Sequence, residues 1–365
     1  MANYKKMPKK SKSNEENQTT QPLVTYSIFN NSEALTQGWY PLLASKKLRR
    51  GQAKSVRIMA QRVVLFRGKD GDVRALDAFC PHFGADLGNG VVIENRIQCR
   101  MHHWEFSGDG NVAHIPCQDH KPEHVKLRSY PVEEKFGFLW VFAGEKAAHA
   151  LPIPPGVGGA EFEGSYLGEV ELFAHHHIMM INGIDLQHFS AVHNLDIDFE
   201  FESEDKKNGV FDWHLRGALP DRGFKAKLGR WLLGEQFSYS VRFAGGSLVA
   251  ISYGVNQRFR GKGRLLPALH IVWGCMPQPE GNSKVKIFLL NKKRTGIIGF
   301  IKSAFLKALT LGLLTILKDE DVKAFPNFRF SPTAVLAKDK SVARLIGLIE
   351  TLPLSLWAKQ SNKGV

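Results

Sequence analysis

Cysteine is scarce in this sequence, with only four among 365 residues: Cys80, Cys99, Cys117 and Cys275. That number is too small for the disulfide framework of a secreted protein, so we expect a reducing compartment. We expect Cys117 and Cys275 to be small buried side chains. Cys80 and Cys99 each have a histidine close by, which predicts a different role for them.

Several sequence patterns are also missing. The chain has neither a Gly-rich dinucleotide-binding fingerprint nor the cysteine set of a plant-type ferredoxin, so we expect an external electron donor for any redox site. No nucleic-acid-binding module is visible, and we expect no nucleic-acid partner, although 49 Lys and Arg exceed 35 Asp and Glu. Residues 1–24 lack the apolar core of a signal peptide and predict a disordered basic tail.

Two short motifs each combine one cysteine with one histidine. Cys80 and His82 form the first, and Cys99 and His102 form the second. A structural zinc remains an alternative, although zinc sites usually begin from Cys pairs and His pairs. A [2Fe–2S] cluster with both thiolates on one iron and both imidazoles on the other needs this mixed pattern, which is that of a Rieske centre.

The hydrophobic patterns predict two domains and an α+β fold class. Residues 25–146 predict an all-β domain that carries the cluster motifs and ends in a buried strand at 137–142. Pro and Gly are frequent in residues 147–160, which predict a linker. Residues 161–365 mix helical and strand patterns, so we expect one antiparallel sheet with helices packed on it.

A second group of candidate ligands comprises Asn182, Asp185, His188 and His193. On a helix, Asp185 and His188 would share one face. His188 and His193 lie about 140° apart after one full turn, so both imidazoles reach one metal only if the helix ends or distorts between them. A carboxylate from elsewhere would complete the two-His, one-carboxylate triad of non-haem Fe(II), which leaves positions open for O₂.

With both motifs in place, the chain after the tail resembles the oxygenase component of Rieske non-haem iron oxygenases. The resemblance implies one [2Fe–2S] cluster on Cys80, His82, Cys99 and His102, and one mononuclear Fe(II) per subunit, with O₂ as co-substrate. It also implies a helix-grip-like catalytic domain and a homotrimer, in which Asp185 relays electrons from His102 of a neighbouring subunit. A ferredoxin or flavin reductase would deliver the electrons, so NAD(P)H is used only indirectly. Asn182 belongs to the same motif and is a further catalytic candidate.

The third iron ligand is expected among the acidic residues near position 320. This segment resembles the Gln-Asp-Val-x-Ile-Trp-Glu-Asn-Lys run of steroid-ring hydroxylases and cholesterol desaturases, with Phe325 and Asn327 at the Trp and Asn places. The resemblance implies Asp321 as the ligand, with Asp319 as its rival. Asp319 and Glu320 are otherwise interpreted as a solvated acidic cap.

The resulting prediction is a terminal oxygenase that hydroxylates or desaturates a bulky apolar substrate, with a sterol or steroid as the leading class. An oxygenase or oxidative cyclase for an aromatic or other natural-product ring is the alternative. A different class, a Rieske electron carrier without its own oxygenation, would have no use for His188 and His193 at this spacing.

Two further segments have more than one interpretation. Residues 297–317 are apolar except for Lys302, Lys307 and small polar residues, which predicts either a helix buried under the active site or a basic helix that dips into a membrane surface. We accordingly expect a cytoplasmic protein, with peripheral contact at the inner face of a membrane in the second case. The run of histidines at 175–177 is interpreted as core or surface side chains without a metal.

Overall fold

The structure is a computed structural model that describes residues 26–157, 162–254, 268–278, 281–293, 295–324, 330 and 336–358. The predicted tail at 1–24 and the end of the predicted linker at 158–160 lie outside the described residues. Phe325 and Asn327 also lie outside them.

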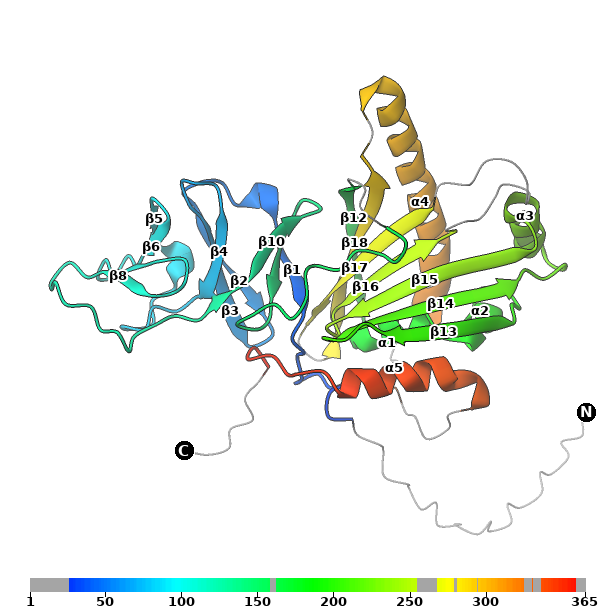
Figure 1. The fold of residues 1–365 in the computed structure, drawn as a ribbon, viewed down its shortest axis with the longest axis horizontal. Coiled ribbons are helices and arrows are strands. Elements are labelled where there is room, and N and C mark those ends of the chain that lie inside the picture. Colours follow the sequence, from blue (N-terminus) through cyan, green and yellow to red (C-terminus); the bar gives the residue numbers. More distant parts are fainter. Residues whose placement is uncertain are drawn as a thin grey trace, which may run out of the picture.

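The first domain consists of three small antiparallel sheets (Figure 1). Their strand orders are β1-β11-β10, β2-β3-β4-β9 and β5-β6-β7-β8. Apolar runs explain the central strands, because all five residues of β11 are buried and so is the middle of β3. The strands are β1 (Trp39–Ala44), β2 (Ala53–Ile58), β3 (Gln61–Arg67), β4 (Val73–Asp77), β5 (Val91–Ile93), β6 (Arg96–Gln98), β7 (Glu105–Phe106), β8 (Val112–His114), β9 (Ser129–Tyr130), β10 (Val132–Lys135) and β11 (Phe138–Phe142).

The second domain is built on one antiparallel sheet of seven strands in the order β12-β18-β17-β16-β15-β14-β13. Side chains alternate between its two faces: Val249 and Ile251 belong to one core cluster, and Leu248 and Ala250 belong to another. The strands are β12 (Phe162–Leu172), β13 (Phe199–Asp205), β14 (Val210–Ala218), β15 (Gln236–Ala244), β16 (Leu248–Tyr253), β17 (Leu269–Pro277) and β18 (Ser283–Lys292).

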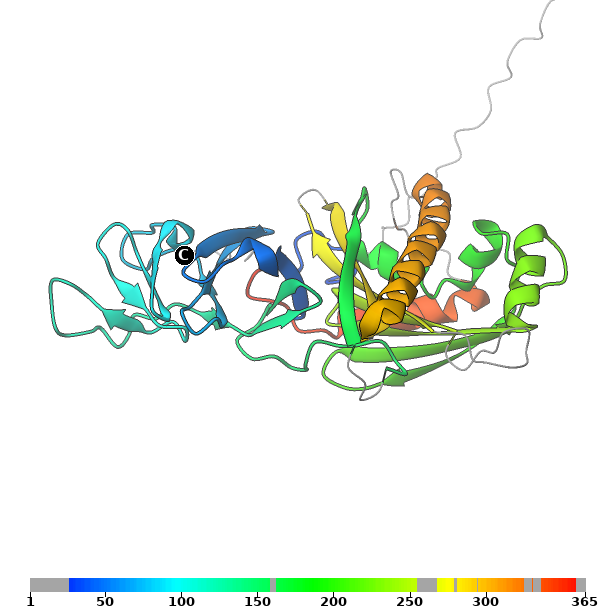
Figure 2. The ribbon, with the colours of Figure 1, turned by 90° about the horizontal axis from the view of Figure 1, so that it is seen from above.

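The α-helices of the described residues lie on one side of this sheet, as the view from above shows (Figure 2). Ile178 and Leu345, from the first and last of them, belong to the core cluster on that face. The predicted α+β fold with a large antiparallel sheet is therefore confirmed. The helices are α1 (His176–Asn182), α2 (Leu186–Ala191), α3 (Phe224–Leu233), α4 (Gly296–Ala324) and α5 (Lys340–Glu350).

The two domains share a core. Trp39 and Phe142 of the first domain are buried in one cluster with Leu248 and Phe288 of the second. The chain after α5 then returns to the first domain, where Trp357 is 1% exposed and packs against Tyr40 and Tyr130. The C-terminal segment therefore connects the two domains. No local sequence pattern predicts these contacts, because they join distant parts of the chain.

The structure contradicts the expected burial of Cys117 and, of the two alternatives for residues 297–317, the buried helix. Cys117 is exposed, whereas Cys275 is buried as expected. The long helix α4 is not buried in its first half, since Ile297 and Phe300 are 81% and 73% exposed. The helix begins just after the end of β18, and its first turns project beyond the sheet (Figure 1). Its later turns run back toward α2.

Candidate functional site

The four cluster residues lie on two loops of the same shape, which follow β4 and β6. In the first loop the backbone N–H of Gly84 donates to the Cys80 carbonyl at 2.8 Å, and in the second His103 donates to the Cys99 carbonyl at 3.0 Å. Gly84 and His103 both have positive φ, at 78° and 57°. The two loops therefore share a backbone turn, although His82 follows Cys80 by two residues and His102 follows Cys99 by three.

The two cysteines are buried side by side, each 2% exposed. Burial, together with the neighbouring Cys99, raises the pKa of the Cys80 thiol to about 11. The His82 and His102 rings lie 4.5 Å apart, and His82 stacks on Trp104 at 4.7 Å. The buried Nδ1 atom of His82 has no hydrogen-bond partner. Paired thiols and an unpartnered ring nitrogen fit a [2Fe–2S] cluster, which would bind both as ligands.

The second group of ligands converges where α2 meets the last turn of α4. Helix α2 ends at Ala191, so the helix does end between His188 and His193, as convergence requires. The Oδ1 atom of Asp321 lies 2.8 Å from His188 Nε2 and 3.5 Å from His193 Nε2. Ligand atoms of these three residues all lie within 4.8 Å of one another.

Glu320 is the site residue that sequence reasoning missed. Its Oε2 atom lies 2.8 Å from His193 Nδ1, so the imidazole donates its Nδ1 proton to this carboxylate. The interpretation of Glu320 as part of a solvated cap is wrong, because its side chain is only 26% exposed and contacts His193. Adjacency to Asp321 was the available signal, because consecutive residues on a helix point about 100° apart and can reach two neighbouring imidazoles.

This hydrogen bond fixes the tautomer of His193. In a neutral imidazole with its proton on Nδ1, Nε2 is the acceptor atom that can bind a metal, and it lies 3.5 Å from Asp321 Oδ1. The donor set of two imidazoles and one carboxylate is also the one that suits iron(II), so the described residues fit a mononuclear metal at this position.

Asp185 and Asn182 lie just before α2. The Asp185 carboxylate is the N-cap of α2 and accepts from the backbone N–H groups of Gln187 and His188 at 3.0 and 3.2 Å. Asn182 is the last residue of α1 and is partly buried. The side chain of Asp319 lies outside the described residues.

Aromatic side chains surround the His193 side of the site. Phe189 lies 6.1 Å from the His193 ring and 5.8 Å from Tyr239, measured between ring centroids. The Tyr239 hydroxyl donates to the carbonyl of Gly183 at 3.0 Å. Burial raises the pKa of Tyr253, and the Asp321 carboxylate adds to this effect. Aromatic rings therefore lie beside the His193 side of the site.

His175, His176 and His177 also come together, with ring centroids 4.2 to 4.4 Å apart. They are buried, which agrees with their interpretation as core side chains. The Nδ1 atoms of His175 and His177 accept backbone N–H bonds from His177 and Asn30. Their Nε2 atoms must then carry the protons and cannot bind a metal, so this cluster is a poor metal site despite its geometry.

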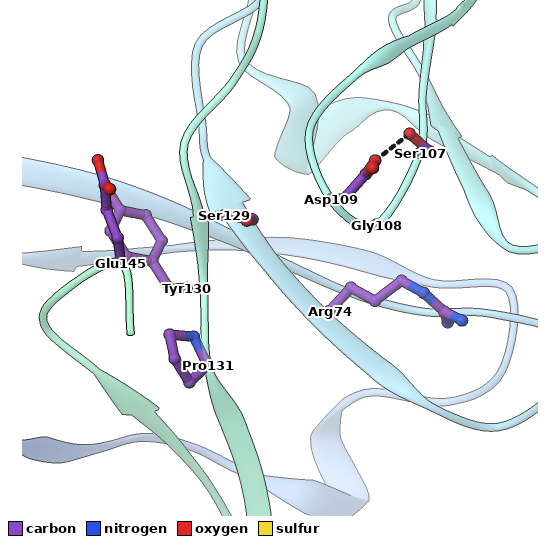
Figure 3. A pocket seen from close by; sticks show the side chains of 8 residues that line it. All are labelled: Arg74, Ser107, Gly108, Asp109, Ser129, Tyr130, Pro131 and Glu145. Carbon is purple, nitrogen blue, oxygen red and sulfur yellow. Dashed lines mark hydrogen bonds between the residues drawn. The ribbon is translucent and has the colours of Figure 1, made fainter. Parts of the chain in front are cut away.

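A shallow depression on the first domain is lined by Arg74, Ser107, Gly108, Asp109, Ser129, Tyr130, Pro131 and Glu145 (Figure 3). Asp109 accepts a hydrogen bond from the Ser107 hydroxyl within it. None of the cluster or iron-site residues lines this depression, and we assign it no role in the chemistry.

Comparison with known proteins defines the class. Residues 38–131 match the Rieske [2Fe–2S] domain family, so the first domain is a Rieske domain. Dicamba monooxygenase, solved with non-heme iron and dicamba, superposes with a TM-score of 0.57 at 20% identity over 88% of this chain and 97% of that one. The chain thus has the two-domain fold of Rieske oxygenases.

Two further relatives are more similar in sequence. Cholesterol 7-desaturase nvd 1 of Ciona intestinalis is 35% identical over 162 residues, which cover 43% of this chain and 34% of the relative. A probable 3-ketosteroid-9-alpha-monooxygenase oxygenase component of Rhodococcus rhodochrous is 31% identical over 175 residues, which cover 46% of this chain and 44% of the relative. The chain therefore spans less than half the length of either relative.

Proposed function

We propose that this protein is the terminal oxygenase of a multicomponent Rieske system. The observation that carries the proposal is the convergence of His188, His193 and Asp321 in the domain that follows a Rieske domain. A mononuclear iron held by these three residues would supply O₂ activation. Glu320 would hold the His193 proton at Nδ1, and the Asp185 cap would hold the start of α2 and hence His188.

The proposed reaction is hydroxylation or desaturation of a bulky apolar molecule. Either reaction consumes O₂, two electrons and two protons; hydroxylation releases one water, and desaturation releases two. A sterol or steroid is the proposed substrate class, supported by the two relatives named for cholesterol and 3-ketosteroid. The aromatic side chains Phe189, Tyr239 and Tyr253 beside the iron ligands agree with an apolar substrate.

The test is turnover of a substrate panel. Protein reconstituted with iron, a reducing system and O₂ is incubated with sterols, ketosteroids and polycyclic aromatics, and products are identified by mass spectrometry. The proposal predicts a sterol or steroid product that has gained one oxygen or lost two hydrogens. Oxidation of aromatics alone would favour an aromatic-ring oxygenase instead. The likeness in fold to dicamba monooxygenase is the observation that supports this alternative.

A Rieske electron carrier is the competing class. A carrier would retain the cluster but need no iron in the second domain. Iron analysis giving about two rather than about three irons per chain, with an intact cluster spectrum, would favour the carrier.

Electrons are proposed to arrive from a ferredoxin or a flavin reductase, so that NAD(P)H acts only indirectly. His102 is exposed on the surface of the first domain, where a second protein chain can reach it. We propose that it faces Asp185 of a neighbouring subunit in a homotrimer. Sedimentation should then give a trimer, and monomeric variants should lose turnover.

The proposal includes peripheral contact between residues 297–317 and the inner face of a membrane, beside an apolar substrate. Among the described residues, no helix is both long and apolar enough to cross a membrane.

A further inference from the structure

The first turns of α4 expose an unusual number of large apolar side chains. Ordinary surface positions expose such residues singly, and a contiguous exposed group indicates an interaction surface. Here they fall within nine consecutive positions. The exposed fractions are 81% for Ile297, 70% for Ile298, 73% for Phe300, 59% for Ile301 and 69% for Phe305.

These side chains lie on the side of the helix that faces away from the protein. Among the positions of this part of α4 whose burial the structure describes, Gly299, Leu306 and Thr310 are the buried ones. At about 100° per residue, these three fall on one narrow stripe, and the exposed apolar residues spread across the opposite side. The outward face of a surface helix is normally polar, so the pattern is inverted. We call the five exposed residues, from Ile297 to Phe305, the outer face of α4.

Two lysines lie along the borders of the outer face. Lys302 and Lys307 fall at about 110° to either side of its centre, between the apolar side chains and the buried stripe. Lys302 is exposed and Lys307 is half-buried. Lysines in this position can extend their ammonium groups sideways to phosphate headgroups while the apolar residues enter the acyl boundary.

The charge next to the outer face in the sequence is positive. Residues 287–318 contain six Lys or Arg residues and no Asp or Glu, whereas Lys284 and Lys286, earlier on β18, form ion pairs with Glu171 and Glu169. Lys292 and Lys293, at the end of β18 just before α4, are exposed. A second copy of this chain would bring the same positive charges face to face, which is unfavourable, whereas an anionic surface is complementary.

We propose that the outer face of α4 inserts into the headgroup region of an anionic lipid bilayer. The inference rests on the proposed function in one respect, because it names the bilayer as the source of the apolar substrate. Helix α4 also carries Glu320 and Asp321 near its other end, about 30 Å from Ile301 along the helix axis. One rigid element would thus connect the membrane surface to the iron site.

The test is vesicle binding by the full-length holoprotein. Sedimentation with phosphatidylcholine vesicles is compared with sedimentation with vesicles that also contain phosphatidylglycerol, at low and high salt. We expect binding to the anionic vesicles that weakens with salt, and a loss of about tenfold or more for the double variant Phe300→Ser/Phe305→Ser. Lys302→Gln/Lys307→Gln should lose affinity for anionic vesicles only.

Phe224→Ser on α3 is the matched control, because Phe224 is 81% exposed but lies outside the outer face. It should bind vesicles like the wild type. Absence of vesicle binding, or equal binding by the Phe300/Phe305 variant, would overturn the inference. Self-association of the wild type that this variant abolishes, without vesicle binding, would assign the outer face to a second copy instead.

Failure of the proposed function would be seen in iron content and turnover, whereas failure of the membrane inference would be seen in vesicle binding. Iron content and turnover of a detergent-dispersed sterol do not depend on the outer face, so both should be the same in the Phe300/Phe305 variant and in the wild type. An intact cluster spectrum in that variant shows that it is folded.

Discussion

Replacing Glu320 by alanine should weaken iron binding at the second-domain site without touching a proposed ligand. Glu320 accepts the Nδ1 proton of His193 over 2.8 Å, and His193 is only 7% exposed. Hydrogen bonds to a charged group contribute about 1.5–3 kcal/mol. Loss of this bond should therefore weaken the metal affinity about 10- to 100-fold, which is also the usual effect of removing a partner of a ligating histidine.

The substitution Glu320→Gln separates the hydrogen bond of the carboxylate from its negative charge. The Gln carbonyl can accept the same Nδ1 proton but carries no charge, and a neutral hydrogen bond contributes about 0.5–1.5 kcal/mol. We expect iron affinity to fall only a few-fold to about tenfold in this variant. Glu202→Gln, an exposed carboxylate on β13, is the control and should bind iron like the wild type.

Affinity is measured by competition between the apo second-domain site and an Fe(II) chelator, with the Rieske cluster intact and monitored by its absorbance. Turnover is not needed for this measurement. An alanine variant that binds iron within about twofold of the wild type would refute the argument that Glu320 fixes the His193 tautomer.

Three further predictions concern electron transfer, pH and packing. Asp185→Asn keeps a good N-cap for α2 but removes the charge, so cluster and iron should remain while turnover is lost; near-normal turnover would refute the relay. Burial lowers the pKa of His175 to about 4 and lowers the pKa values of His176 and His177 well below the usual value, so protons bind the unfolded chain first. The free energy of unfolding should therefore fall as pH drops below about 6.5, by up to about 1.4 kcal/mol per pH unit for each histidine. Urea unfolding between about pH 6.5 and 5.5, above the range where carboxylates titrate, should show this slope, and a flat profile would contradict it. Trp357→Ala removes a side chain that is 1% exposed and should cost about 3–5 kcal/mol of unfolding free energy by the same measurement. A cost below about 1 kcal/mol would show that the C-terminal segment does not fasten the domains.

Local patterns predicted the parts of the site that depend on short stretches of chain. The two cluster loops are each complete within a few residues, and the structure brings the two cysteines together and the two histidine rings together, while their role as cluster ligands stays a prediction. The need for a helix end between His188 and His193 followed from helix geometry alone, and α2 does end there. The structure also brings Asp321 to both imidazoles, although its role as an iron ligand stays a prediction.

Contacts between distant segments were not predictable in the same way. Glu320 looked like a solvated residue because its partner, His193, is 127 residues earlier in the chain. The sequence left two interpretations of the apolar segment at 297–317, a buried helix and a helix at a membrane surface, since composition does not say which side of a helix meets the protein. Trp357 reaches Tyr130 only after both domains have formed.

The most direct test of the central claim is the iron and acid-labile sulfide content of anaerobically reconstituted protein, compared with Asp321→Ala. The oxygenase proposal predicts about three irons and about two sulfides per wild-type chain. The variant should keep an unchanged Rieske electron paramagnetic resonance signal and hold about two irons. Equal iron content in both proteins, at about two per chain, would contradict a mononuclear iron held by His188, His193 and Asp321.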